Sequence, residues 1–256
     1  SPTNTRFAQM QANRIWFHLM GRGIVDPIDD FRATNPPANP ALLDWLAKEL
    51  VANRFDLKQM IRTIMNSRTY QLSSVPNDSN RDDERNFSHA QIRRLSAEQL
   101  LDSFSLVLGA PANFNGYPRG MRAGELPGVM AVRTREMAPS SGDHFLRVFG
   151  RPSRLQSCEC ERSEDSTLTQ AFELVSGPLV HEMLSRSDNR LSTIATSKDS
   201  PRQILDSLYW SALGRAASEA EAAAAVEHLK TGKDRRAALE DIAWALLTSD
   251  EFVLRR

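Results

Sequence analysis

The sequence predicts a mainly α-helical, multi-helix globular domain with a long irregular segment in its middle. Apolar residues recur at helical spacing towards both ends of the chain, alternating strand patterns are scarce, and prolines and glycines crowd the centre. The 256 residues are 41% hydrophobic and 25% charged, as in an ordinary protein that buries a core. We therefore expect one domain over 1–256, with N-terminal helices in 1–109, a loop-rich centre in 110–165 and C-terminal helices in 166–256.

The N-terminal part is expected to hold three helices. Helical periodicity covers 6–20 and stops at two glycines, a second apolar stripe covers 42–51, and a third covers 57–68. Prolines exclude a helix through 26–40, and Pro40 suits the first turn of the next helix.

The rest of the chain is predicted to pass from one helix through loops to a second helical region. Ser96 is typical of an N-cap for a helix that runs to Leu108. Residues 109–154 are expected to be mostly loop, with a brief amphipathic turn at 144–149, and helices follow at 166–184, 201–213, 218–229 and 234–254. All four tryptophans fall in predicted helices, so we expect them in the core or between helices: Trp16, Trp45, Trp210 and Trp244.

Net charge and hydropathy argue against two classes of partner. The 32 Lys and Arg residues balance 32 Asp and Glu residues, so no overall positive field favours nucleic acid. No run of about 18 apolar residues exists, so we expect no membrane span in this segment. The chain also lacks an initiator Met and a signal peptide, which leads us to expect a piece of a longer polypeptide.

The most unusual local pattern places two cysteines one residue apart. In an extended strand, Cys158 and Cys160 would share one side while Glu159 and Glu161 take the other, so the two thiols could meet a metal together. The alternative is that the thiols are buried and structural, flanked by Glu–Arg ion pairs. In that case we expect Arg162 to reach a carboxylate elsewhere in the chain. No Cys-x-x-Cys-His occurs, so no haem is expected in this domain.

A second candidate is the acidic stretch around Asp26, Asp29 and Asp30, beside Arg32. Closely spaced carboxylates in a loop can hold a hard cation such as calcium. Their spacing matches no known calcium loop, so we expect Asp29 and Asp30 instead to cap backbone N–H groups and pair with arginines, which would stiffen the loop. Gly-rich phosphate loops, nucleophile elbows and zinc-protease helices are absent from the sequence.

A series of longer motifs covers nearly the whole chain, beginning with the 13–25 stretch. The motifs that follow it are 29–32, 35–37, 55–58, 67–73, 83–87, 93–98, 149–152, 158–163, 213–215, 238–241 and 244–247. In sequence and in order, these motifs resemble the planctomycete-specific domain of unknown function 1553.

The resemblance implies a C-terminal module of exported planctomycete proteins, set in the periplasm or at the cell surface. It implies a preceding companion domain and often a c-type cytochrome domain, so a c-type haem would lie elsewhere in the full-length protein. The partners it implies are other domains of the same polypeptide, a cell-envelope protein or a polysaccharide. No established activity comes with the resemblance.

Two function hypotheses follow. The first is a non-catalytic helical interaction module that docks against the cytochrome-type or companion domain. The second is an enzyme or a redox or metal-binding domain, acting on carbohydrate, with a site that combines 158–162 with 29–32. The candidate functional residues are Asp29, Asp30, Arg32, Arg151, Cys158, Glu159, Cys160, Glu161 and Arg162, with Cys158 and Cys160 as candidate metal ligands and Asp29 or Asp30 as the expected acceptor for Arg162.

Overall fold

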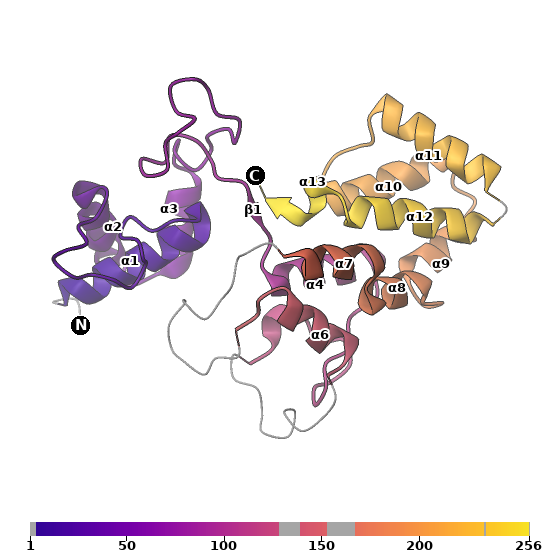
Figure 1. Ribbon diagram of the computed structural model, residues 1–256, viewed down its shortest axis with the longest axis horizontal. Coiled ribbons are helices and arrows are strands. Elements are labelled where there is room, and N and C mark those ends of the chain that lie inside the picture. Colours follow the sequence, from indigo (N-terminus) through magenta and orange to yellow (C-terminus); the bar gives the residue numbers. More distant parts are fainter. Residues whose placement is uncertain (1–3, 128–138, 153–166, 233, 256) are drawn as a thin grey trace. The chain divides into compact units, whose positions relative to one another are not determined.

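The computed structural model describes residues 4–127, 139–152, 167–232 and 234–255. Helices dominate these residues, which confirms the predicted mainly α fold (Figure 1). Contacts divide the chain into two compact units, Ser1–Arg93 and Arg94–Arg255. The boundary falls within the predicted N-terminal helical region, just before the helix expected to start at Ser96.

The first unit consists of three helices and two long loops. Its helices are α1 (Thr5–Met20), α2 (Pro40–Ala52) and α3 (Leu57–Met65). Each begins at a side chain that accepts a hydrogen bond from a first-turn amide, namely Asn4, Asn39 and Asp56. α1 ends at Gly21, whose φ of 91° lies in the left-handed region that glycine adopts without strain. The core of this unit includes Trp16, Leu46, Leu50 and Ile64.

The second loop of this unit, between α3 and Arg93, is organised by one carboxylate. Asp83 accepts hydrogen bonds from the backbone N–H groups of Arg85, Asn86 and Ser88 at 3.0, 2.8 and 3.1 Å. Hydrogen bonds from Ser88 and its neighbours hold the pKa of the Asp83 carboxyl well below its usual range. Phe87 then packs edge-on against Trp16, with ring centroids 5.2 Å apart. The loop is therefore tied to α1 through buried aromatic contact.

The second unit packs its helices around one hydrophobic core. Phe104, Phe145, Phe149, Leu205 and Leu239 are among its most buried side chains. Several helices start with a Ser or Thr cap and a Gln, Glu or Asp three residues later, which explains why the sequence shows these starts clearly. The elements are β1 (Arg93–Arg94), α4 (Ala97–Leu108), η1 (Ala123–Glu125), α6 (Ser141–Val148), α7 (Leu168–Ser176), α8 (Pro178–Ser185), α9 (Arg190–Ala195), α10 (Pro201–Leu213), α11 (Glu219–Thr231), α12 (Arg235–Leu247), α13 (Asp250–Val253) and β2 (Leu254–Arg255). β1 and β2 pair as a two-stranded sheet.

Several details differ from the sequence prediction. α9 was not expected, and the predicted 234–254 helix is α12 followed by the single turn α13 and by β2. Ser249 caps α13 and forces this break, because its side chain accepts from the Phe252 amide. The brief turn expected at 144–149 is the two-turn helix α6.

The expectation for the tryptophans is wrong for two of the four. Trp16 is buried, but Trp45 is 48% exposed and Trp210 is 60% exposed. Both lie on the outward faces of helices whose leucines already fill the core, so periodicity alone could not show which face is buried. No helix within the described residues is long and apolar enough to cross a membrane.

Candidate functional site

A buried asparagine on α1 shapes the loop that connects α1 to α2. Asn13 is 0% exposed. Its Nδ2 donates to the carbonyl oxygens of Val25 and Ile28 at 2.9 and 3.0 Å, and its Oδ1 accepts from the Val25 amide at 3.0 Å. These bonds satisfy three backbone groups that the loop buries against the helix. Asn13 therefore fixes the path of the loop that carries the predicted acidic residues.

The acidic residues of this loop each pair with an arginine. Asp29 accepts from the Arg14 guanidinium at 2.8 Å, and Asp30 accepts from Nε and Nη2 of Arg32 at 2.7 and 2.6 Å. These hydrogen bonds from Arg32 lower the pKa of the Asp30 carboxyl. The Arg32 amide also donates to Asp30 at 3.3 Å.

Asp26, the third acidic residue of the stretch, pairs with Arg22 at 3.2 Å. Within the described part of the chain, no group of three or more His, Cys, Asp or Glu residues is placed to hold a metal ion. The loop thus follows the interpretation in which carboxylates cap amides and pair with arginines, and it does not follow the calcium-loop alternative.

A pocket of about 340 Å³ opens where this loop meets the first turns of α1 and α2. Two arginines, two amide side chains and one carboxylate provide its polar groups, and Phe31, three prolines and three aliphatic residues provide its apolar groups. The lining residues are Arg6, Gln9, Val25, Phe31, Arg32, Ala33, Asn35, Pro36, Pro37, Pro40, Leu43 and Asp44. Its volume lies at the lower end of the range of about 300–1,000 Å³ that is typical of small-ligand sites.

The chemistry of this lining suits binding and not covalent catalysis. None of the lining residues is a His, Cys, Ser, Thr, Lys or Tyr, so the pocket offers no activated nucleophile. Its one carboxylate, Asp44, already accepts from Gln9 Nε2 at 2.7 Å. A single engaged carboxylate does not provide the acid and base pair that most hydrolytic sites need.

The remaining predicted site residues lie in the second unit or outside the described residues. Arg151 belongs to the second unit, where its Nη2 donates to the Pro127 carbonyl at 2.8 Å and its Nε lies 3.7 Å from a Glu98 carboxylate oxygen. Five predicted residues lie outside the described part of the chain: Cys158, Glu159, Cys160, Glu161 and Arg162. The hypotheses of a thiol metal site and of an Arg162 pair with Asp29 or Asp30 therefore stay predictions.

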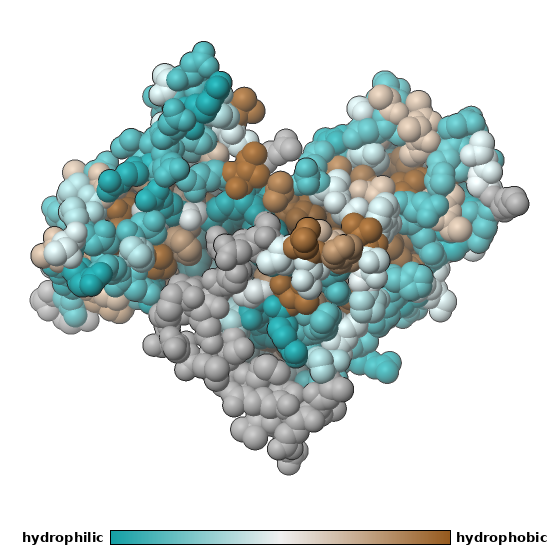
Figure 2. All heavy atoms as spheres, in the orientation of Figure 1, coloured by the Kyte–Doolittle hydropathy of each residue, from teal (hydrophilic) through white to brown (hydrophobic). Residues whose placement is uncertain are grey.

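In the second unit, α7 buries polar side chains and exposes apolar ones, which is the reverse of an ordinary surface helix. Gln170 and Glu173 are buried, whereas Leu168, Phe172 and Val175 are 79%, 68% and 58% exposed. These three apolar residues are spaced four and three apart, so they form one stripe along the helix, here called the α7 stripe. Figure 2 shows hydrophobic side chains gathered over α7.

Trp244 of α12 extends the apolar surface beside the α7 stripe. Its indole Nε1 donates to the Val175 carbonyl at 3.3 Å, and its side chain is 37% exposed. Sequence reasoning missed this surface because a stripe of Leu, Phe and Val at helical spacing is the usual mark of a core-facing side. The available signal was the pair Gln170 and Glu173 at the same spacing on the other side of the helix.

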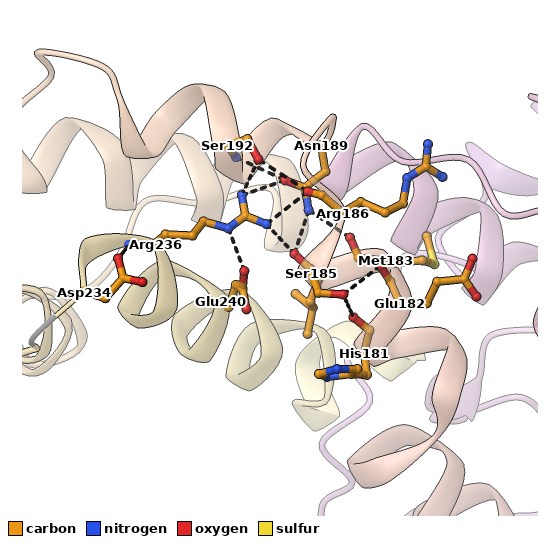
Figure 3. Close-up of polar contacts among 11 residues, drawn as sticks. His181, Glu182, Met183, Ser185, Arg186, Asn189, Ser192, Asp234, Arg236 and Glu240 are labelled. Carbon is orange, nitrogen blue, oxygen red and sulfur yellow. Dashed lines mark hydrogen bonds and ion pairs between the residues drawn. The ribbon is translucent and has the colours of Figure 1, made fainter.

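Two arginine clusters in the second unit are structural. Arg236 Nη1 donates to Asn189 Oδ1 and Ser192 Oγ at 2.9 and 2.8 Å, and Nη2 donates to the Leu184 and Arg186 carbonyls. In Figure 3 the Arg236 side chain lies between Glu240 and the segment that joins α8 to α9. Every donor of this cluster points at protein, so it holds α12 against α8 and α9 and leaves no group for a ligand.

The second cluster centres on Arg215, just after α10. It binds Glu221 and Glu251 at 2.8 Å each and lies over the Tyr209 ring, 5.4 Å from its centroid. Hydrogen bonds from Arg215 and Ser218 lower the pKa of Glu221 to about 2.

Comparison with known proteins identifies one family. The family described as Protein of unknown function (DUF1553) matches residues 1–229. No curated protein and no solved structure matches the chain significantly. The matched range includes the pocket, the α7 stripe, Arg215 and Glu221, whereas Trp244 and Glu251 lie beyond it.

Proposed function

We propose that this chain, which belongs to the family of proteins of unknown function DUF1553, is a non-catalytic interaction module of a larger cell-envelope protein. In this proposal the module docks through the α7 stripe against the cytochrome-type or companion domain of the same polypeptide. The observation that carries the proposal is that α7 exposes its apolar side and buries its polar side, with Phe172 exposed and Glu173 buried.

Contacts with α6 hold α7 with its polar side towards the core. Gln170 Nε2 donates to the Val148 carbonyl at 3.0 Å, and its Oε1 accepts from the Thr167 amide at 3.2 Å. Glu173 lies against His144 of α6, with Nε2 and Oε2 3.6 Å apart. Rotation of α7 to bury its apolar side would break the contacts of Gln170 with Val148 and of Glu173 with His144, so α6 holds the stripe facing outwards.

An outward stripe of this size favours association. Burying one large apolar side chain contributes about 1.5–3 kcal/mol, so three such side chains together offer several kcal/mol to a complex. Contiguous apolar patches on soluble proteins often mark binding surfaces. The nearby Trp244 side chain adds an aromatic group of the kind enriched at the centres of interfaces.

The choice of partner rests on the resemblance, which implies companion and cytochrome-type domains and a periplasmic or cell-surface setting. Any c-type haem would belong to that other domain. The enzyme alternative has less support, because the described half of its site, residues 29–32, consists of carboxylates already engaged by arginines.

Hydroxyl-radical footprinting of the isolated chain and of the full-length polypeptide tests the docking. We expect Phe172 and Trp244 to be oxidised rapidly in the isolated chain and at least about fivefold more slowly in the full-length protein, since an interface excludes water. The same oxidation rate in both proteins would refute docking through this surface. Slow oxidation already in the isolated chain would show that another part of the chain covers the stripe, and would also refute the proposal.

A pair of variants supplies the matched control. Phe172→Ser should restore fast oxidation of Trp244 in the full-length protein. Leu106→Ser replaces another exposed apolar residue, 78% exposed on α4 against 68% for Phe172, and should leave Trp244 protected. If both substitutions raise the oxidation rate of Trp244 equally, the cause is a general loss of folding and the interface is not specific.

A further inference from the structure

We propose that the pocket between the 25–37 loop and the first turns of α1 and α2 binds an acidic saccharide, a sugar that carries a carboxylate or sulfate group. The inference concerns the first unit alone and goes beyond the docking function proposed above. Three features of the lining support it: an excess of positive charge, unengaged hydrogen-bond acceptors, and an apolar wall.

The positive charge comes from two arginines and two helix starts. Arg6 has no hydrogen-bond or ion-pair partner among the described residues. Arg32 uses Nε and Nη2 on Asp30, which leaves Nη1 available. Guanidinium groups bind carboxylate and sulfate oxygens through charge-assisted hydrogen bonds.

α1 and α2 both begin at the pocket, since Arg6 and Pro40 line it. Their first turns contain no acidic residue, and neutral asparagines cap them. The positive ends of both helix dipoles therefore remain uncompensated on this side. Asp44 is the only acidic residue in the lining, but Asp30, outside the lining, already pairs with Arg32. The positive charge that favours an anion in the pocket therefore comes mainly from Arg6 and the two helix starts.

The acceptors indicate a ligand rich in hydroxyl groups. Gln9 and Asn35 use their amide nitrogens within the protein, Gln9 on Asp44 and Asn35 on the carbonyl oxygens of Asp26 and Asp30. Their amide oxygens, and Asp44 Oδ2, accept no hydrogen bond from the described residues. The two amides are held by their own N–H donors and Asp44 by the bond that it accepts from Gln9, so each of the three oxygens can accept a hydroxyl proton.

The apolar wall suits the flat, carbon-bearing face of a sugar ring. Phe31 is half-buried, and Pro36 and Pro37 present rigid rings beside it. Prolines have no amide hydrogen, so this wall offers apolar area without competing donors. An acidic peptide would also use the arginines and the wall, but it offers one backbone N–H donor per residue, whereas a sugar ring offers several hydroxyl donors close together to the three acceptors. The set of groups therefore favours a saccharide over a peptide.

Titration by NMR of the ¹⁵N-labelled chain with defined probes tests the site. We expect tetragalacturonate to bind with a Kd below about 1 mM and to shift the side-chain amide signals of Gln9 and Asn35. Its methyl ester has the same rings without charge and should bind at least about tenfold more weakly. Tetraglutamate, which has the carboxylates without hydroxyls, and inorganic sulfate should also bind at least about tenfold more weakly.

A sulfated galactan tetrasaccharide distinguishes the two anionic groups, and binding of either saccharide at the pocket supports the proposal. The proposal is overturned if neither saccharide shifts the signals at about 10 mM, which is tenfold above the expected upper limit of the Kd. Equal affinity for tetraglutamate or for sulfate would also overturn it, because the site would then select a peptide or a bare anion.

Variants of the lining separate this pocket from general charge attraction. Arg6→Gln and Arg32→Gln should each weaken tetragalacturonate binding about tenfold, since each removes one charge-assisted contact. Arg68→Gln removes an exposed charge of the same unit outside the pocket and should leave binding unchanged. Equal losses in all three variants would contradict the assignment. Footprinting of Trp244 is independent of these results, so the docking proposal can fail while this one stands.

Discussion

Replacement of Asn13 by alanine tests how the pocket loop is held. The side chain makes three hydrogen bonds of 2.9–3.0 Å to backbone groups of the loop, in a position without solvent access. Each such bond contributes about 1 kcal/mol net, and alanine leaves all three backbone groups buried without a partner. Asn13→Ala is therefore expected to lower the free energy of unfolding of the first unit by about 3 kcal/mol.

Hydrogen exchange measured by mass spectrometry gives the relevant readout, because it reports on this unit separately. Since 1.4 kcal/mol corresponds to a factor of ten, amides of α1 should exchange about a hundredfold faster in the variant. Asn66→Ala is the matched control: Asn66 is exposed and its side chain makes no hydrogen bond within the described residues. Its effect should stay within about 0.5 kcal/mol.

Asn13→Asp sharpens the test. The aspartate retains an acceptor for the Val25 amide but turns an oxygen towards two carbonyl oxygens in place of the amide donors. It should therefore destabilise the unit at least as much as alanine does. Exchange rates in Asn13→Ala that match those of Asn66→Ala would refute the reasoning, because the loop would then keep its path without this residue.

Other predictions concern the second unit. Arg236→Ala should lower the free energy of unfolding in urea by about 3 kcal/mol, because it removes the hydrogen bonds of the guanidinium to five oxygen atoms and its ion pair with Glu240. Arg235→Ala, at an exposed neighbouring position, should change it little. Gly177→Ala should lower the melting temperature clearly, because an added Cβ would lie 2.6 Å from the Glu173 carboxyl carbon and closer still to its backbone oxygen; an unchanged melting temperature would contradict this packing. The pKa of Glu221 falls from 4.5 to about 2, so its contribution to stability is present above about pH 4.5 and is lost as pH falls through 2. Acid titration of Glu221→Gln should accordingly show less loss of stability over that range than the parent chain, and identical acid curves would argue against the ion pair with Arg215.

The sequence allowed the helices and the role of the acidic loop to be predicted, because both depend on local chemistry. Ser96 and Pro40 mark helix starts through hydrogen bonds and backbone angles within a few residues. Asp30 pairs with Arg32, two positions away, which a short-range argument can reach.

The pocket and the α7 stripe could not be predicted in this way. Gln9 meets Asp44 across 35 residues of sequence, and no local pattern indicates that contact. Phe172 has the spacing of a core residue, and the contacts of Gln170 and Glu173 with α6 determine that it faces outwards. The hypothesis that joins 158–162 to 29–32 depends on long-range placement of the same kind and stays a prediction.

The central proposal is docking through the α7 stripe, and photo-crosslinking from position 172 tests it most directly. A photoreactive phenylalanine analogue replaces Phe172 in the full-length polypeptide, with the same analogue at Leu106 as the control, and the crosslinked peptides are identified by mass spectrometry. We predict crosslinks from position 172 to peptides of the cytochrome-type or companion domain, and none to that domain from position 106. Crosslinks from position 172 confined to residues 1–256, or the same crosslinks from both positions, would contradict the proposal.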